Sequence, residues 1–398
     1  MSSKEDSSHA GVAAATAAGA LTVKAVTSGR DKARFIDLPY RLYRRNDHWV
    51  APLRMSQKDI LNTSKHPFYK TSDVEMYLAE RDGRAVGRIM AIFNRAHNEF
   101  HQEKAGHFGF FEVEKDFEAA SALVDAAAAW LRGRGAECIR GPFNPSTNYE
   151  CGLLVDAFDK SPRIMMTYNQ DYYAAFLERC GLTKAMDLYA YDIHSDSFNM
   201  SDKLKRVAER TRVKDGITVR TVNMKDFERE VQRIREVYND AWSRNWGFVP
   251  VSPEEFEHLA RDLKQIVDPR VVMIAERKEE GRSEPRPVGF FLAVPDLNLA
   301  LKKVPSGRLL PFGILKLLYY SRKINTMRII TMGGIKEYQS LGLGALFYDE
   351  IYSRGPQSGY PKGEMSWVLE NNVLMNRAAL MLGGHKTRTY RIYEKSLK

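Results

Sequence analysis

The sequence is poor in cysteine and contains no long apolar run. Its 398 residues include three cysteines, Cys138, Cys151 and Cys180. They form no CxxC pair, and an odd number does not suit a disulfide framework, so we expect reduced thiols in a cytosol. No stretch reaches the ~20 apolar residues of a membrane-spanning helix, which excludes an integral protein of that kind.

Metal motifs and a basic tail are also missing. The nine histidines show no HExxH pattern and no paired metal spacing, so no bound metal is expected. Lysine and arginine (60) outnumber aspartate and glutamate (50), a formal charge of +10. Because this surplus is spread along the chain, nucleic acid is disfavoured as a partner. A phosphorylated cofactor or an anionic membrane surface remains.

The first 20 residues are rich in alanine, glycine and serine. Their leading charges are Lys4, Glu5 and Asp6 rather than the basic cluster of a signal peptide. This composition predicts a disordered leader over residues 1–20.

What the sequence does contain is an internal repeat, and its length fits two domains of about 150–200 residues. The segments 77–94 and 273–294 both read Ala-Glu-Arg, a polar turn, Val-Gly and an apolar strand. The segments 177–193 and 379–395 both read G-x-x-K followed by a strand with tyrosines. Two such matches in the same order predict a duplication.

The order of helical and strand patterns predicts a mixed α/β fold. We expect two tandem domains, each a central mixed sheet flanked by helices, over residues 21–195 and 217–398. A charged helix over 196–216 links them. Within the second domain, Ser252-Pro253-Glu254-Glu255 is a capping box that opens a helix.

A glycine-containing corner follows a predicted strand of the second domain. Residues 335–352 read IKEYQSLGLGALFYDEIY, with Gly342 and Gly344 where the strand gives way to a helix. Glycines expose the backbone N–H groups of a helix N-terminus, and such groups bind a pyrophosphate. A tight packing corner is the alternative. The first domain has acidic residues at this point, so it is not expected to form a second site.

The pattern Gln339-x-x-Gly342-x-Gly344 resembles the acyl-CoA loop of the GCN5-related N-acetyltransferase (GNAT) superfamily. The resemblance implies acyl-CoA as co-substrate and no metal. It also implies that the end of the preceding strand pairs with pantetheine, that the loop holds the pyrophosphate, and that an asparagine lies near the pantetheine. The residues at these positions are Met332, Gly333, Gly334, Gln339, Leu341, Gly342, Leu343, Gly344, Ala345 and Asn376.

The catalytic groups are less clear from the sequence. Glu370, at the end of the strand MSWVL, is the candidate base for a substrate ammonium. It could equally cap the helix that begins at Asn371. The superfamily often has a tyrosine that protonates the leaving thiolate, but this chain has Met381-Leu382 there. Tyr390 and Tyr393 are the substitutes.

Two segments could line the acceptor pocket. In RGPFNPSTNYECGLL, the polar residues Asn144, Asn148 and Glu150 interrupt an apolar neighbourhood. A structural turn built on Gly141-Pro142 and Asn144-Pro145 is at least as good an interpretation. In WSRNWGFVPV, Trp246 and Phe248 could form a groove for a lipid chain, or simply pack in the core.

A short apolar segment, GRLLPFGILKLLYYSRKINTMR (307–328), carries Arg308, Lys316, Arg322 and Lys323. It fits either a buried helix or an interfacial helix that dips into anionic lipid. The sequence does not decide between them.

Over nearly its whole length the chain also resembles the bacterial family that includes bacterial ceramide synthase. The stretches that carry the resemblance are FIDLPYRLYRRNDHWVAPL, FNRAHNEFHQEKAGHFGFFE, NPSTNYECGLLVDAF and GRLLPFGILKLLYYSRK. It implies a cytoplasmic, peripherally membrane-bound N-acyltransferase that moves a long acyl chain from CoA to the amine of a sphingoid base, in its 3-keto form. An acetyltransferase of a small or protein amine, and a non-catalytic CoA or lipid sensor, are the alternatives.

Overall fold

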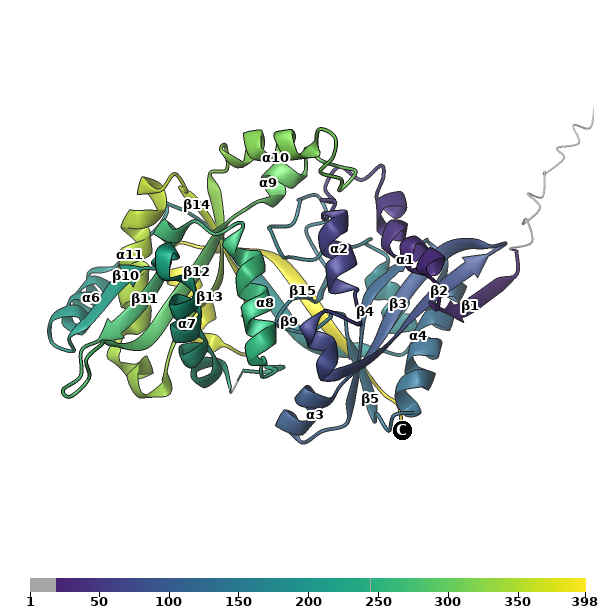
Figure 1. Cartoon of the computed structure of the whole chain (residues 1–398), viewed down its shortest axis with the longest axis horizontal. Coiled ribbons are helices and arrows are strands. Elements are labelled where there is room, and N and C mark those ends of the chain that lie inside the picture. The colour runs from purple at the N-terminus through teal and green to yellow at the C-terminus, as the bar shows by residue number, and fades with distance from the viewer. Residues whose placement is uncertain (1–18, 244) are drawn as a thin grey trace, which may run out of the picture.

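Figure 1 shows the computed structural model, which describes residues 19–243 and 245–398. Nearly all of the predicted leader lies outside the described residues. We call residues 19–200 the first half and residues 201–398 the second half. The first half contains, in chain order, β1 (Leu21–Ala25), α1 (Gly29–Leu42), α2 (Arg54–Ile60), β2 (Ser72–Arg81), β3 (Arg84–Asn94), α3 (Arg95–His101), β4 (Ala105–Val113), α4 (Phe117–Arg132), β5 (Cys138–Gly141), β6 (Phe143–Asn144), β7 (Glu150–Cys151), β8 (Leu153–Leu154), α5 (Tyr173–Arg179) and β9 (Thr183–His194).

The second half repeats this order with insertions. It contains α6 (Asp202–Val213), β10 (Ile217–Thr221), α7 (Phe227–Trp242), α8 (Pro253–Lys264), β11 (Val272–Arg277), β12 (Arg286–Pro295), α9 (Asn298–Leu301), α10 (Gly313–Ser321), β13 (Thr326–Gly334), α11 (Leu343–Gln357), β14 (Lys362–Leu369), α12 (Val373–Met381) and β15 (His385–Ser396). The mixed α/β class predicted from the sequence is confirmed.

One sheet runs through both halves, with the strand order β1-β2-β3-β4-β5-β15-β9-β14-β13-β12-β11-β10 and β8 beside β15. The last strand of each half is exchanged with that of the other half. β15, the last strand of the chain, pairs with β5 of the first half, and β9 of the first half pairs with β14 of the second. The sequence analysis expected a separate sheet in each half. The exchange instead joins the halves through backbone hydrogen bonds, and β9 and β15 cross the centre of Figure 1 together.

Local signals explain why the helices around the cavity form where they do. Ser252 caps α8 by accepting the amide of Glu255, and Pro253 occupies the first turn, as the capping box predicts. On α7, side chains at helical spacing turn toward the sheet, and Trp242 lies 5.1 Å from the ring of Phe290 on β12. Each large apolar side chain buried this way contributes about 1.5–3 kcal/mol.

The predicted linking helix has a structural role of its own. α6 packs across the start of α11, where the Thr211 hydroxyl donates to the carbonyl of Leu341, and Arg212 pairs with Asp349 on the next turns of α11. α6 therefore braces the glycine corner.

Candidate active site

A cavity opens where β13 and β14 part. These parallel strands pair only as far as Ile329 and Met365. The register between β12 and β13 shifts at Leu292/Ala293, which bends β13 away from its neighbour. The gap widens into a cavity of about 310 Å³.

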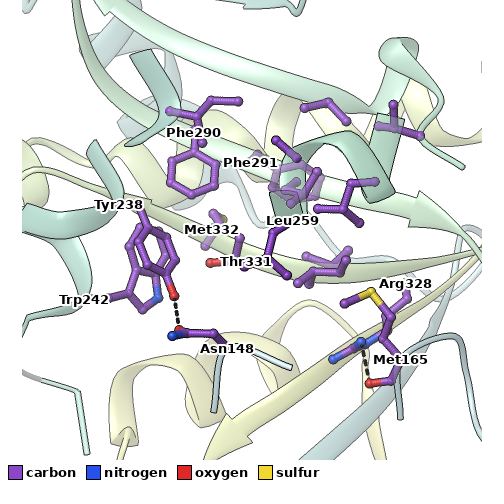
Figure 2. Close-up of a pocket in the computed structure, with 18 of the residues that line it drawn as sticks. Asn148, Met165, Tyr238, Trp242, Leu259, Phe290, Phe291, Arg328, Thr331 and Met332 are labelled. Atoms are coloured by element: carbon purple, nitrogen blue, oxygen red, sulfur yellow. Dashed lines mark hydrogen bonds between the residues drawn. The ribbon is translucent and has the colours of Figure 1, made fainter. Parts of the chain in front are cut away.

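The cavity is bounded by both halves and is largely apolar. Residues of β12, β13 and β14 line one side of it, residues of α7 and α8 line another, and the loop 147–149 of the first half closes it beside Tyr238 (Figure 2). Asn148 in that loop accepts the Tyr238 hydroxyl of α7 and donates to the carbonyl of Val249. The main apolar lining comes from Met165, Phe227, Val231, Ile234, Trp242, Phe256, Leu259, Leu263, Phe290, Phe291, Leu292, Ile330, Met332 and Trp367.

The two glycines of the corner have different surroundings. Gly342 has φ +90°, and a Cβ there would come within 2.5 Å of Val207 and 2.9 Å of Thr211 on α6. Gly344 is open, because a Cβ there would meet only Tyr348 at 3.7 Å and Met332 at 3.9 Å. In the described part of the chain no side chain caps α11. Its first-turn amides are therefore free to receive an anion.

The other predicted cofactor residues fall into two groups. Met332 lines the cavity, and the Gln339 amide donates to the carbonyl of Gly334, which closes the corner. Gly333 and Gly334 allow other side chains of the protein to pack closely against β13. A Cβ on Gly333 would lie 2.6 Å from Trp242, and a Cβ on Gly334 would lie 2.3 Å from Leu343. The remaining members are part of the turn or of α11: Leu341, Leu343 and Ala345.

Both polar atoms of the Asn376 side chain are hydrogen-bonded within the protein. Its amide nitrogen donates to the carbonyls of Leu369 and Asn372, and its oxygen accepts the Tyr191 hydroxyl. These bonds fix α12 to the end of β14. A pantetheine contact does not fit this position, and Met375 and Asn372 of α12 line the cavity instead.

Glu370 does not fit the role of catalytic base. Its carboxylate accepts from the Lys184 ammonium at 2.6 Å and from the Asp187 amide at 3.0 Å. The alternative of a helix cap is wrong as well, because Asn372 caps α12 by accepting the amide of Met375.

The two tyrosines proposed as acids lie on the exchanged strand β15. Tyr393 packs in the core of the first half, where its hydroxyl donates to Glu178. This follows from the pairing of β15 with β5, and a catalytic role does not fit it. Tyr390 is fully buried beside Cys151 and Leu188, with no partner for its hydroxyl among the described residues.

Three of the predicted acceptor residues are structural in this arrangement. The Asn144 side chain accepts the Phe110 amide at 2.6 Å and shapes the bulge of β4. Phe248 is buried beside Phe100 and Tyr238, at the contact between the halves. Trp246 packs against the cluster around Leu369. Asn148 alone of these four residues lines the cavity.

Glu150 has the properties expected of a base. It follows the cavity wall at residues 147–149 without itself lining the cavity, and the charge that acts on its pKa is the Arg328 guanidinium, which does line the cavity. Burial raises the pKa of Glu150 to about 7, and Arg328 opposes that shift. Burial likewise raises the pKa of Glu255 on α8 to about 7, but that carboxylate already accepts the Tyr149 hydroxyl.

Tyr348 is a cavity residue that the sequence analysis missed. It lies one turn after Gly344 on α11, its hydroxyl contacts only the Met375 sulfur, at 3.7 Å, and burial raises its pKa to about 12. It is therefore a neutral proton donor close to the corner. Its i+4 spacing from Gly344 would have placed it on the same helix face.

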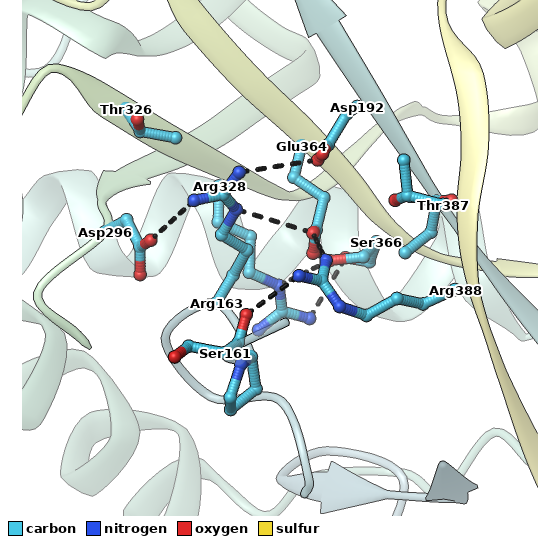
Figure 3. Close-up of polar contacts among 12 residues, drawn as sticks. Ser161, Arg163, Asp192, Asp296, Thr326, Arg328, Glu364, Ser366, Thr387 and Arg388 are labelled. Atoms are coloured by element: carbon cyan, nitrogen blue, oxygen red, sulfur yellow. Dashed lines mark hydrogen bonds and ion pairs between the residues drawn. The ribbon is translucent and has the colours of Figure 1, made fainter. Parts of the chain in front are cut away.

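A buried ionic cluster fixes the far wall of the cavity (Figure 3). Arg163, in a loop of the first half, pairs with Asp296 at 3.2 Å and approaches Glu364 at 3.5 Å. Arg388 of β15 pairs with the same Glu364 at 2.7 Å. Arg328 donates to the carbonyls of residues 164 and 165 and to that of residue 366. Removing one partner of such a cluster costs about 3–5 kcal/mol.

Histidine and aspartate side chains also meet at the contact between α2 and α8. Ligand atoms of Asp59, His66 and His258 lie within 4.8 Å of one another, so the three could hold a metal ion. His66 already accepts the Phe68 amide through Nδ1, and His258 lies 3.3 Å from Asp59. Contacts within the protein account for this group.

Comparisons with known proteins agree with this geometry. The chain is 37% identical to the bacterial ceramide synthase of Caulobacter vibrioides over 388 residues, which covers 95% of this chain and 98% of that protein. It is 33% identical to protein YghO of Escherichia coli K12 over 381 residues, 94% of this chain and 95% of that protein. A tandem GNAT protein from the clavulanic acid biosynthesis pathway matches the fold with a TM-score of 0.54 and 11% identity, over 95% of this chain and 99% of that chain. No family model matches.

Proposed function

This chain belongs to the family of the bacterial ceramide synthase and is an N-acyltransferase, and we propose that it moves a long acyl chain from CoA to the amine of a sphingoid base, in its 3-keto form. The observation that carries the proposal is the apolar cavity that extends from the open Gly344 corner between α7 and α8. A short acyl group would leave most of that apolar surface in contact with water, which is unfavourable.

Acyl-CoA would bind with its pyrophosphate against the first turn of α11. The free amides and the helix dipole attract the anion there without a side-chain cation. Its pantetheine would follow β13 past Met332, in the gap where β14 has turned away. The thioester would then lie near the point of separation, close to Arg328 and Ser366.

In the proposed reaction Glu150 takes the proton and Tyr348 returns one. An aliphatic ammonium must lose a proton to Glu150 before its nitrogen can attack the thioester carbon. The new C–N bond forms, the C–S bond breaks, and the leaving thiolate takes a proton from the Tyr348 hydroxyl. The second proton that the nitrogen loses as the amide forms returns Tyr348 to its neutral state. The pKa of Glu150, about 7, suits a base that works near neutrality.

We also propose that the protein works at the surface of an anionic membrane. Among the described residues, no helix has the length and apolar character that crossing a bilayer requires. On α10 and the turn before it, large apolar side chains face outward, with Leu310 78% exposed and Phe312 68% exposed. We call the exposed set Leu310, Phe312, Leu315, Leu318 and Tyr319 the α10 patch.

The charges around the α10 patch fit an anionic surface. Residues 297–325 contain no aspartate or glutamate. Each basic residue near such a surface adds about 1 kcal/mol of attraction, so the attachment is reversible and sensitive to salt. The basic residues of this stretch are Lys302, Lys303, Arg308, Lys316, Arg322 and Lys323.

Mass spectrometry of the products tests the reaction. Purified protein, given a series of acyl-CoAs and amines, should form an amide fastest from a long-chain acyl-CoA and a long-chain amine. Preference for acetyl-CoA and a small amine would contradict the proposal, and no product with any pair would favour a non-catalytic sensor.

Co-sedimentation with phosphatidylglycerol vesicles tests the location. Leu315→Ser with Leu318→Ser should release the protein from vesicles at low salt. The matched control is Leu374→Ser, which changes a side chain that is 80% exposed on α12, outside the patch. Release by the control alone, or no binding by the wild type, would contradict the location.

A further inference from the structure

We propose that the lipid amine enters the cavity through the seam between α8 and α10, with α10 as a movable lid. This inference rests on the proposed function. It adds the route by which the acceptor reaches the thioester.

Apolar side chains of α8 and α10 meet in one cluster at the seam. Leu317, on the inner face of α10, belongs to one apolar cluster with Leu263 and Ile266 of α8 and with Ile330 of β13. Leu263 and Ile330 also line the cavity. The Arg163–Asp296 ion pair lies beside this cluster but joins neither helix, and no salt bridge among the described residues links α8 to α10.

α10 itself is lightly held. Gly313 is the only buried residue of the helix, and its apolar side chains are divided between the outward α10 patch and a partly buried inner row, Ile314, Leu317 and Tyr320. Its principal neighbour is the short helix α9, and the two stand out from the body in Figure 1. A segment with so few buried contacts opens at low cost.

A bilayer would shift the balance toward the open lid. In water, lifting α10 exposes the inner row, which is unfavourable. At a membrane both faces of the helix can contact acyl chains, so this cost largely disappears. The acceptor's tail could then pass from lipid into the cavity without crossing water, while its amine moves toward Glu150.

A reversible lock on the seam tests the route. In a background with Cys138→Ser and Cys180→Ser, Ile266→Cys and Leu317→Cys are joined by a short thiol-specific crosslinker that a reductant cleaves. The buried Cys151 is left in place. Acylation of a long-chain amine presented in phosphatidylglycerol vesicles should fall about tenfold or more when the seam is locked, because gating motions control access.

A soluble short-chain amine provides the control within the same sample. Its acylation and the affinity for acyl-CoA should be unchanged by the lock, and reduction should restore the long-chain rate. Equal long-chain rates in the locked and reduced forms would overturn the route. An equal loss with both amines would overturn it too, since the lid would then act on catalysis rather than on entry. If the unlocked protein acylates only the short amine, the proposed function fails instead, and the route fails with it.

Discussion

The two halves present the same backbone frame at the place where acyl-CoA would bind, and they fill it differently. In each half a Val-Gly pair on the middle strand faces the end of its neighbour, so Gly87 pairs with Val113 as Gly289 pairs with Gly334. In the first half the backbone of Val113 is already bonded, since its amide donates to the Tyr173 hydroxyl oxygen and its carbonyl accepts the Tyr172 hydroxyl. In the second half the equivalent region opens into the cavity.

The helices that follow these strands, α4 and α11, also differ in whether a protein side chain occupies the N-terminus. α4 is capped by Asp116, whose carboxylate accepts the Ala119 amide and pairs with Arg81. The first half therefore supplies its own anion, while α11 begins at Gly342 and supplies none. In the proposed account the first half forms a wall of the cavity and the second half holds the site. The proposed catalysis depends on the contact between the halves, because Glu150 comes from the first half and Tyr348 from the second.

The largest expected effect comes from giving α11 an anion of its own. Gly344→Asp should weaken acyl-CoA binding by about a thousandfold, since like charges near 4 Å repel by about 4 kcal/mol at a protein surface. Calorimetry with a non-hydrolysable acyl-CoA analogue measures this loss. The matched control is Glu118→Gln in the first turn of α4, which should leave the affinity unchanged. Gly342→Asp is less informative, because its side chain would also strain the contact with α6.

Removal of the proposed base should lower turnover but not binding. Glu150→Gln should reduce kcat about a hundredfold or more. Wild-type kcat should rise with pH through about 7, as the carboxyl ionises. Glu370→Gln serves as the matched control and should leave kcat nearly unchanged, because Glu370 is committed to Lys184. A larger loss of kcat in Glu370→Gln than in Glu150→Gln would indicate that Glu370 is the base.

The raised pKa of Glu150 also has a consequence for stability. Burial favours the protonated form, so the folded state holds this proton more tightly than the unfolded state does. Stability is therefore lost as pH rises from the ordinary carboxyl range through about 7. Glu150→Gln should raise the melting temperature at pH 8 more than at pH 5. Equal shifts at both values would show that Glu150 titrates normally.

Loss of the proposed acid should have a smaller effect on rate. Tyr348→Phe should reduce kcat about tenfold to a hundredfold, at the low end of general acid–base contributions. Acyl-CoA affinity should not change, because the hydroxyl contacts only the Met375 sulfur. Single-turnover rates with acyl-CoAs whose thiol leaving groups differ in pKa check the role. The loss should shrink as the leaving group becomes more acidic, and a constant loss would contradict it.

The smallest effect on activity should come from changing Tyr173, which occupies the equivalent region of the first half. Tyr173→Phe removes the partner of the Val113 amide and should cost about 1–3 kcal/mol of unfolding free energy. Acyl-CoA affinity should stay the same. If the variant instead gained a second acyl-CoA site, the first half would be an occluded site rather than a wall.

Much of the frame could be predicted because its signals are local. The capping box at Ser252 and the turn at Gly342 each depend on a few neighbouring residues, and each was found where predicted. The edge strands β1 (LTVKA) and β10 (ITVRT) were missed although both alternate apolar and polar residues, since a run of five residues is short for a periodic signal.

The catalytic groups could not be predicted in the same way. Glu370 and Glu150 look alike in sequence, and what separates them is the ion pair with Lys184 in one case and burial near Arg328 in the other. Tyr393 seemed close to the site because its strand follows α12. Strand patterns do not specify which sheet a strand joins, so the exchange that carries β15 to β5 has no local signal.

The number of acyl-CoA molecules bound per chain tests the central claim most directly, namely that the second half alone holds the live site. Calorimetric titration with a non-hydrolysable long-chain acyl-CoA analogue should give one molecule per chain for the wild type and none for Gly344→Asp. Two molecules per chain, or one that survives Gly344→Asp, would contradict the account.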